Sequence, residues 1–195
     1  ANMACTLDII SNGRLELGVG AGWNEEECEA YGIALGSTHE RFDRFEEGLT
    51  VLQLLLTRDR SSFSGEHYEL RDAMNNPKAI QDPLPICVGG AGLRLTIQAA
   101  EQFAHHWNYG SQNMSVDDFE RRHEFFAQAC VEVGRDPADI TISTLLRYDG
   151  DISATVRQAE DYAAAGVDLG LVSIPKHEPP AVVATIAEGL AHLGN

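Results

Sequence analysis

The sequence lacks both a long hydrophobic run and a surplus of basic residues. No stretch approaches the roughly 18 apolar residues that a membrane-spanning helix needs, so we expect no membrane role. Lys and Arg number 14 against 30 Asp and Glu, and the formal net charge is −16. Nucleic-acid binding requires clustered basic side chains, and acidic surfaces are repelled by anionic lipid. The composition therefore favours a globular protein that binds neither nucleic acid nor membranes.

Cysteine is scarce and widely spaced, at Cys5, Cys28, Cys87 and Cys130. With no CxxC pair, this spacing matches neither a zinc site nor a small disulfide scaffold, and it predicts reduced, mostly buried cysteines in a cytoplasmic protein. His105 and His106 are adjacent on a predicted strand and should point to opposite sides. We therefore predict no metal site. The serine nucleophile motif GxSxG is also missing, and no catalytic residue is identified.

Hydrophobic periodicity predicts alternating strands and helices after an N-terminal segment with helical spacing at Met3, Leu7 and Ile10. Strands are expected at residues 14–22, 83–89, 106–109, 140–146 and 167–174. Helices are expected from residue 40, at 93–103, from 115 to 134, at 153–165 and from 179 onward, with a hairpin at 61–70. Such alternation predicts a parallel α/β sheet, either an open doubly wound sheet or part of a (β/α)8 barrel. Five β/α units and the lack of a linker indicate one domain, residues 1–195.

Two glycine-rich segments follow predicted strands and are candidate binding sites. The first comprises Gly89, Gly90, Ala91, Gly92, Leu93 and Arg94. Its backbone N–H groups at a helix start could hold a phosphate, although a plain tight turn explains the glycines equally well. The second comprises Gly20, Gly22, Trp23 and Asn24, which either line a pocket or serve packing and helix capping. The acidic run 25–27 is expected to face solvent at a helix N-terminus.

Several of these motifs, in a fixed order, carry a family resemblance. The runs lie at residues 7–27, 31–33, 41–47, 63–70, 77–81, 88–92 and 107–108. Together they resemble the luciferase-like monooxygenase superfamily over essentially the whole chain, and most of all its branch that uses the deazaflavin coenzyme F420. His105 departs from the pattern, since relatives often have Asp there.

The resemblance implies a TIM barrel of the bacterial luciferase type with an insertion at about residues 57–82. Aligned with such proteins, the chain resembles the C-terminal two-thirds and begins just before the fourth barrel strand. Three strands and their loops are then absent, and any catalytic residues on them are unknown. A sheet with unpaired edges is expected to associate, so we predict a homo-oligomer.

The resemblance also implies a function. Residues 89–93 would hold the cofactor phosphate through backbone N–H groups, and residues 20–24 would line the pocket. The expected reaction is hydride transfer between coenzyme F420 and a small organic substrate. The alternatives are an FMN-dependent monooxygenase of the same fold and a non-catalytic barrel fragment stabilised by association. Gly90→Asp in a complete barrel is expected to weaken cofactor binding at least tenfold, roughly 1.4 kcal/mol. The melting temperature without cofactor should change little if Gly90 serves the ligand, whereas unfolding of the protein without cofactor would indicate a plain tight turn.

Overall fold

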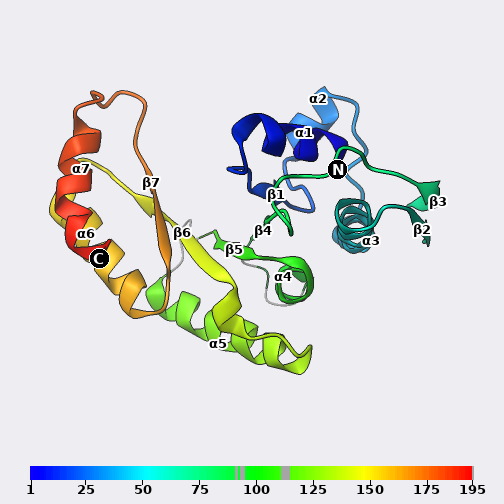
Figure 1. Ribbon diagram of the computed structural model, residues 1–195. Helices are drawn as coiled ribbons and strands as arrows, with labels where there is room; N and C mark the ends of the chain where they lie inside the picture. Colours follow the sequence, from blue (N-terminus) through cyan, green and yellow to red (C-terminus); the bar gives the residue numbers. More distant parts are fainter. Residues whose placement is uncertain (91, 93–94, 111–114, 195) are drawn as a thin grey trace.

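The fold is built on five parallel strands, seen in a computed structural model that describes residues 1–90, 92, 95–110 and 115–194 (Figure 1). The sheet has the order β1-β4-β5-β6-β7. Its strands are β1 (Leu17–Val19), β4 (Ile86–Gly89), β5 (His106–Tyr109), β6 (Thr141–Arg147) and β7 (Leu169–Ser173). The order of the strands in the sheet is their order along the chain, and the hairpin between β1 and β4 forms a separate two-stranded sheet. The predicted parallel α/β sheet is confirmed.

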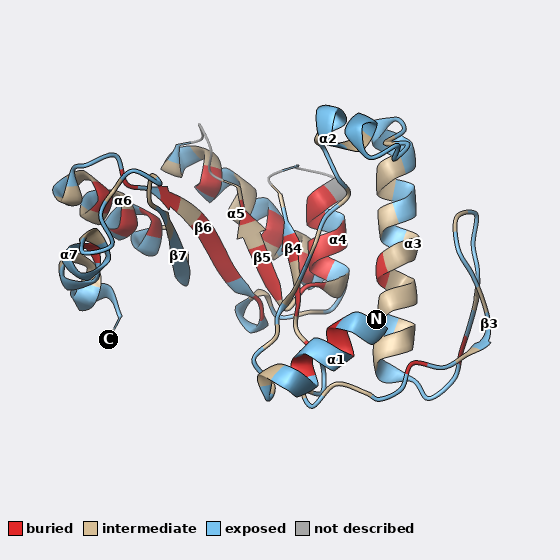
Figure 2. Ribbon diagram, turned by 90° about the horizontal axis from the view of Figure 1, so that it is seen from above, coloured by how far each residue is buried: buried red, intermediate tan, exposed pale blue. Residues whose placement is uncertain are grey.

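Helices follow the strands and lie along the outer side of the curved sheet (Figures 1 and 2). They are α3 (Thr38–Thr57), α4 (Leu95–Phe103), α5 (Val116–Glu132), α6 (Ile152–Ala164) and α7 (Val182–Leu190). The smaller elements are α1 (Asn2–Ser11), α2 (Glu25–Ala30) and two single-turn helices, Pro137–Asp139 and Ala191–Leu193. An antiparallel hairpin, β2 (Ser61–Ser64) and β3 (Glu69–Ala73), lies within the predicted insertion. None of the helices in the described ranges is long and apolar enough to cross a membrane.

Local signals explain where the helices begin and end. Ser37 and Glu40 form a reciprocal capping box at the start of α3. Ser115 caps α5 by accepting a hydrogen bond from the Asp118 N–H at 3.2 Å. Gly134 and Gly166 follow α5 and α6 with φ of +79° and +101°, a conformation that suits glycine at helix ends. The predicted start of the helix after β4, residues 93–94, lies outside the described residues.

The core lies between the outer face of the sheet and the helices. The Trp107 ring stacks on Phe126 with centroids 4.6 Å apart, and Phe119 packs edge-on against Tyr109 at 5.1 Å and Tyr162 at 5.8 Å. All five side chains are buried. Aromatic packing of this kind fixes β5 against α5 and α6, and so fixes the position of the loops that follow β5 and its neighbour β4.

The helix α1 confirms the helical spacing at the N-terminus, but its buried side consists of other residues. Met3 and Ile10 are 81% and 75% exposed, whereas Ala4, Cys5 and Asp8 are buried. The buried Asp8 carboxylate accepts hydrogen bonds from the segment that leads into β4, and these hydrogen bonds compensate for its burial. The helix is therefore anchored by a polar contact rather than by its largest apolar side chains.

Candidate functional site

The two glycine-rich segments meet at one edge of the sheet. Val19 in β1 pairs with Val88 in β4, so Gly20 and Gly89 lie at the carboxyl ends of neighbouring parallel strands. Ligands of α/β barrel proteins bind at this end, where loops from several strands converge. The structure thus brings together the two segments that were predicted separately from the sequence.

The turn after β4 is fastened to β5 through Gly90. Its N–H donates to the Asn108 carbonyl at 3.0 Å, and its carbonyl accepts from the Trp107 indole Nε1–H at 2.9 Å. Gly90 has a φ of +136°, and a Cβ there would lie 3.0 Å from Thr96 Cγ2. A side chain at Gly90 would therefore strain the turn itself. Gly90 therefore serves the turn, and Gly90→Asp is expected to lower the melting temperature without cofactor.

The neighbouring glycines differ in the space around them. A Cβ added to Gly89 would meet no atom within 4 Å, whereas one at Gly92 would lie 2.9 Å from Thr96 Oγ1. Gly89 is exposed on the inner side of the sheet, and Thr96 is buried in the first turn of α4. The predicted site residues Ala91, Leu93 and Arg94 lie outside the described residues. Gly89 is consequently the position at which a ligand can be tested without disturbing the turn.

The segment after β1 combines a turn with a helix cap. Gly22 has a φ of +82°, which favours glycine, and Trp23 is 82% exposed. Asn24 Oδ1 accepts a hydrogen bond from the Glu27 N–H at 3.2 Å and is the N-cap of α2. Of the two roles considered for Asn24, the structure shows the cap. The acidic run 25–27 forms the exposed first turn of α2, as predicted.

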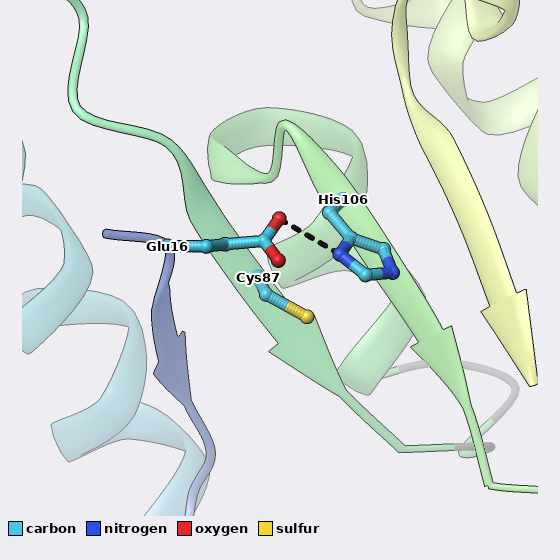
Figure 3. Close-up of side chains that lie close together, drawn as sticks. All are labelled: Glu16, Cys87 and His106. Carbon is cyan, nitrogen blue, oxygen red and sulfur yellow. Dashed lines mark hydrogen bonds and ion pairs between the residues drawn. The ribbon is translucent and has the colours of Figure 1, made fainter. Parts of the chain in front are cut away.

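The inner face of the sheet carries a polar cluster that the sequence did not reveal. His106 Nδ1 lies 2.7 Å from Glu16 Oε1, its Nε2 lies 2.6 Å from Ser143 Oγ, and Cys87 lies beside this pair (Figure 3). The cluster borders an open hollow of about 450 Å³. The lining residues are Glu16, Gly18, Val19, Cys87, Gly89, His106, Asn108, Leu169 and Leu171. Only the register of neighbouring strands brings these residues together, and no local motif indicates it.

The surroundings of Cys87 decide its reactivity. Burial, reinforced by the negative charge of Glu16, raises the pKa of the Cys87 thiol to about 11. A thiol with such a pKa is protonated near neutral pH and is a poor nucleophile. The prediction of mostly buried cysteines holds for Cys5 and Cys130, whereas Cys28 and Cys87 are partly exposed. The spacing of the cysteines along the chain does not indicate that a histidine lies beside Cys87.

His105 and His106 point to opposite sides, as predicted for adjacent strand residues. His105 Nδ1 accepts a hydrogen bond from the Ile86 N–H at 3.2 Å and borders a second hollow with Leu84 and Phe103. Burial, helped by the positive charge of Arg135, lowers the pKa of His105. His105 is therefore neutral near pH 7 and supports β4, while His106 faces the inner hollow.

A parallel β/α sheet with glycine turns at the carboxyl ends of adjacent strands places this chain in the α/β class, whose barrel members bind ligands at that end of the sheet. The sequence pattern that describes luciferase-like monooxygenases matches residues 1–189, and the chain belongs to that family.

A curated relative supports the same membership. Pyrimidine monooxygenase RutA of Pseudomonas savastanoi pv. phaseolicola is 29% identical over 161 residues, which are 80% of this chain and 44% of the relative. The chain thus spans less than half the length of this curated relative.

Two solved structures share the fold. An F420-dependent secondary alcohol dehydrogenase, in complex with an F420-acetone adduct, has a TM-score of 0.75 at 17% sequence identity. The match covers 88% of this chain and 67% of the dehydrogenase chain. The F420-dependent tetrahydromethanopterin reductase of Methanopyrus kandleri has a TM-score of 0.76 at 16% identity, covering 95% and 75%. The five-stranded sheet is accordingly part of a luciferase-like (β/α)8 barrel.

Proposed function

We propose that the protein is an F420-dependent oxidoreductase of the cytoplasm that exchanges hydride with a small organic substrate. The observation that carries this proposal is the glycine turn at the end of β4, held beside the end of β1. The two structural neighbours with F420 in their names support the choice of cofactor. When bound, the deazaflavin ring supplies the hydride chemistry, and the protein positions and shields the ring.

The residues of the turn fit a phosphate group. Gly89 offers open space, since a Cβ there meets nothing within 4 Å. Gly90 and Gly92 let the backbone pass close to Thr96 at the start of α4, whose N-terminus contributes partial positive charge. Because the Gly90 N–H is already bonded to Asn108, we assign phosphate binding to the rest of the turn. Trp23, on the loop after β1, is an exposed aromatic side chain.

A second candidate function is a monooxygenase of the same family that uses reduced FMN and oxygen. The monooxygenase name of the Pseudomonas relative favours it. The two functions differ in their use of oxygen, because the deazaflavin carries hydride but reacts poorly with oxygen. Fluorescence titration of the full-length protein with F420 and with FMN should show tight binding of F420. An oxygen electrode should record no oxygen uptake during turnover. Tight FMN binding with oxygen uptake would establish the monooxygenase instead.

The turn itself is tested by a matched pair of variants at Gly89. Gly89→Asp places a negative charge directly before the turn to which we assign the phosphate, and Gly89→Asn adds a side chain of the same size without charge. We expect Gly89→Asp to weaken cofactor binding at least tenfold relative to Gly89→Asn, roughly 1.4 kcal/mol. Equal dissociation constants for the two variants would contradict the assignment of phosphate binding to this turn. If neither cofactor binds even the unaltered protein, the non-catalytic alternative is supported.

A further inference from the structure

Three different metal-binding side chains converge on the inner face of the sheet, away from the proposed cofactor turn. Glu16 directly precedes β1, Cys87 lies on β4 and His106 is the first residue of β5. Their ligand atoms, a carboxylate oxygen, a thiol sulfur and an imidazole nitrogen, all lie within 4.8 Å of one another (Figure 3). Strand register holds them there, because Cys87 pairs directly with His106.

The cluster lies toward the amino ends of the strands, whereas the glycine turns follow their carboxyl ends. Glu16 comes before the first residue of β1, and Gly20 comes after its last. Likewise, His106 begins β5, and Gly90 follows β4. The inner hollow connects the two levels, since both Cys87 and Gly89 line it. The cluster is therefore a separate site in the same hollow.

The histidine is oriented as metal-binding histidines usually are. The side chain of His106 is only 6% exposed, and its ring is fixed by Ser143 Oγ at 2.6 Å from Nε2. Ser143 is itself fully buried and accepts a hydrogen bond from Asn108 Nδ2 at 2.7 Å. Without an ion, Nδ1–H donates to the Glu16 carboxylate, which can only accept, and the Ser143 hydroxyl can donate to Nε2. Ion binding uses the other tautomer, in which Nε2–H donates to Ser143 and the lone pair of Nδ1 is free for the ion. A polar partner on the second ring nitrogen is the support that imidazole ligands commonly have.

We propose that Glu16, Cys87 and His106 bind a divalent ion of the zinc class, with a fourth position open to the hollow. One thiolate, one imidazole and one carboxylate suit zinc and its neighbours, whereas magnesium and calcium prefer oxygen ligands alone. With bonds of about 2.0 to 2.3 Å, tetrahedral ligand atoms lie roughly 3.5 Å apart. Glu16, whose side chain is 44% exposed, has the freedom to close this distance. Binding replaces the thiol proton of Cys87 by the ion, and the proton passes to solvent.

The experiment uses the complete protein after chelator treatment and two probe ions, Co²⁺ and Zn²⁺. Addition of Co²⁺ should produce a near-ultraviolet thiolate-to-cobalt absorption band that saturates at a single equivalent, and Zn²⁺ should displace it. Cys87→Ser should abolish the band and weaken Zn²⁺ binding by more than about tenfold, because loss of a ligand should cost at least as much as loss of a group that only supports a ligand. The matched controls Cys28→Ser and His39→Asn lie elsewhere on the surface and should keep both signals.

Glu16→Gln is the second test, because removing a half-exposed charge is compatible with folding, as circular dichroism can verify. It should weaken Zn²⁺ binding while keeping the cobalt–thiolate band at saturating Co²⁺. Failure of the unaltered protein to develop the band would overturn the proposal. So would equal Zn²⁺ affinities for Cys87→Ser and Cys28→Ser in folded protein. Neither result depends on F420 or FMN, so the metal site can fail while the proposed oxidoreductase function stands.

Discussion

A single carboxylate ties the first helix to the rest of the molecule. Asp8 is fully buried and accepts hydrogen bonds from the Ile80 N–H at 2.7 Å, the Gln81 N–H at 3.0 Å and the Gln81 side-chain amide at 2.7 Å. The backbone hydrogen bond from Gln81 is the main cause that lowers the pKa of Asp8 below its ordinary value of 3.8. The charged form is thus the one that fits the folded protein.

The lowered pKa makes this contact sensitive to acid. A carboxyl group with a lower pKa in the folded state stabilises the protein above its unfolded pKa, and this stabilisation is lost as pH falls through the folded pKa. Asp8→Asn should therefore lower the melting temperature at neutral pH, and the difference from the unaltered protein should shrink below pH 3.8. Thermal unfolding between about pH 7 and pH 3 measures this. The exposed Asp59→Asn is the control, and a pH-independent difference for Asp8→Asn would contradict the prediction.

Adjacent glycines in the turn after β4 should respond differently to a methyl group. Gly90 has a φ of +136° and little room beside Thr96, whereas Gly89 has open space and an ordinary φ. Gly90→Ala should cost about 1–3 kcal/mol of unfolding free energy, the usual penalty of a strained backbone conformation. Gly89→Ala should change it by less than about 1 kcal/mol. Urea unfolding of both variants without cofactor checks the contrast, and equal stabilities would show that the turn adjusts freely.

At the scale of elements, the β2–β3 hairpin is held to α3 by one glutamate. The Glu47 carboxylate accepts hydrogen bonds from the N–H groups of Glu66, His67 and Tyr68 at 2.8, 2.9 and 3.1 Å. Burial acts to raise the pKa of Glu47, but these backbone hydrogen bonds outweigh it and the pKa is lowered. The loop between the two strands is consequently ordered by a side chain outside the hairpin.

Removing this carboxylate should loosen the hairpin loop alone. In Glu47→Ala, the three amides lose their acceptor, and their hydrogen exchange should quicken by about tenfold or more. Amides of the core strand β5 should exchange at an unchanged rate, because the aromatic packing around Trp107 is untouched. Glu46→Ala, one residue earlier and exposed, is the matched control. A uniform increase over the whole chain would mean that Glu47 supports global stability instead.

The periodic elements of this fold could be predicted from the sequence, whereas contacts between distant segments could not. Apolar spacing and caps identified α3 and α5, and β-branched runs identified β6. The buried side of α1 was not predictable, since the partners of Asp8 lie 72 and 73 positions further along the chain. The cluster of Glu16, Cys87 and His106 was also not predictable, because its residues are far apart in the sequence and only the strand register brings them together.

The glycine turns show the complementary limit. Their residue types indicated a close backbone approach, which the φ of Gly90 and its contact with Thr96 bear out. A tight turn and a phosphate cradle require the same glycines, however, and the sequence could not separate them. The structure adds the open space at Gly89, and with it a variant that separates ligand binding from turn strain.

At the scale of the whole molecule, the inner face of the sheet is open. Leu169 and Leu171 line the hollow and are 44% and 40% exposed. In the described part of the chain, β1 and β7 each pair with a strand on one side only. Exposed apolar surface and unpaired strand edges both favour association with another surface.

The 195-residue chain, purified by itself, should therefore self-associate or bind a hydrophobic dye strongly. Sedimentation at several concentrations and dye fluorescence measure the two outcomes. The predicted homo-oligomer corresponds to a defined species larger than the monomer. A monodisperse monomer that binds no dye and unfolds cooperatively would show that the inner face is closed in solution.

The indole of Trp107 joins the core to the turn, and this gives the protein an optical probe of its own. Trp107 is buried and donates to the Gly90 carbonyl, while the only other tryptophan, Trp23, is 82% exposed. In Trp23→Phe, all indole emission comes from a ring whose N–H follows each movement of the turn after β4. Any ligand that shifts the Gly90 carbonyl then changes the wavelength of that emission, so binding can be followed without a label and without knowing the substrate.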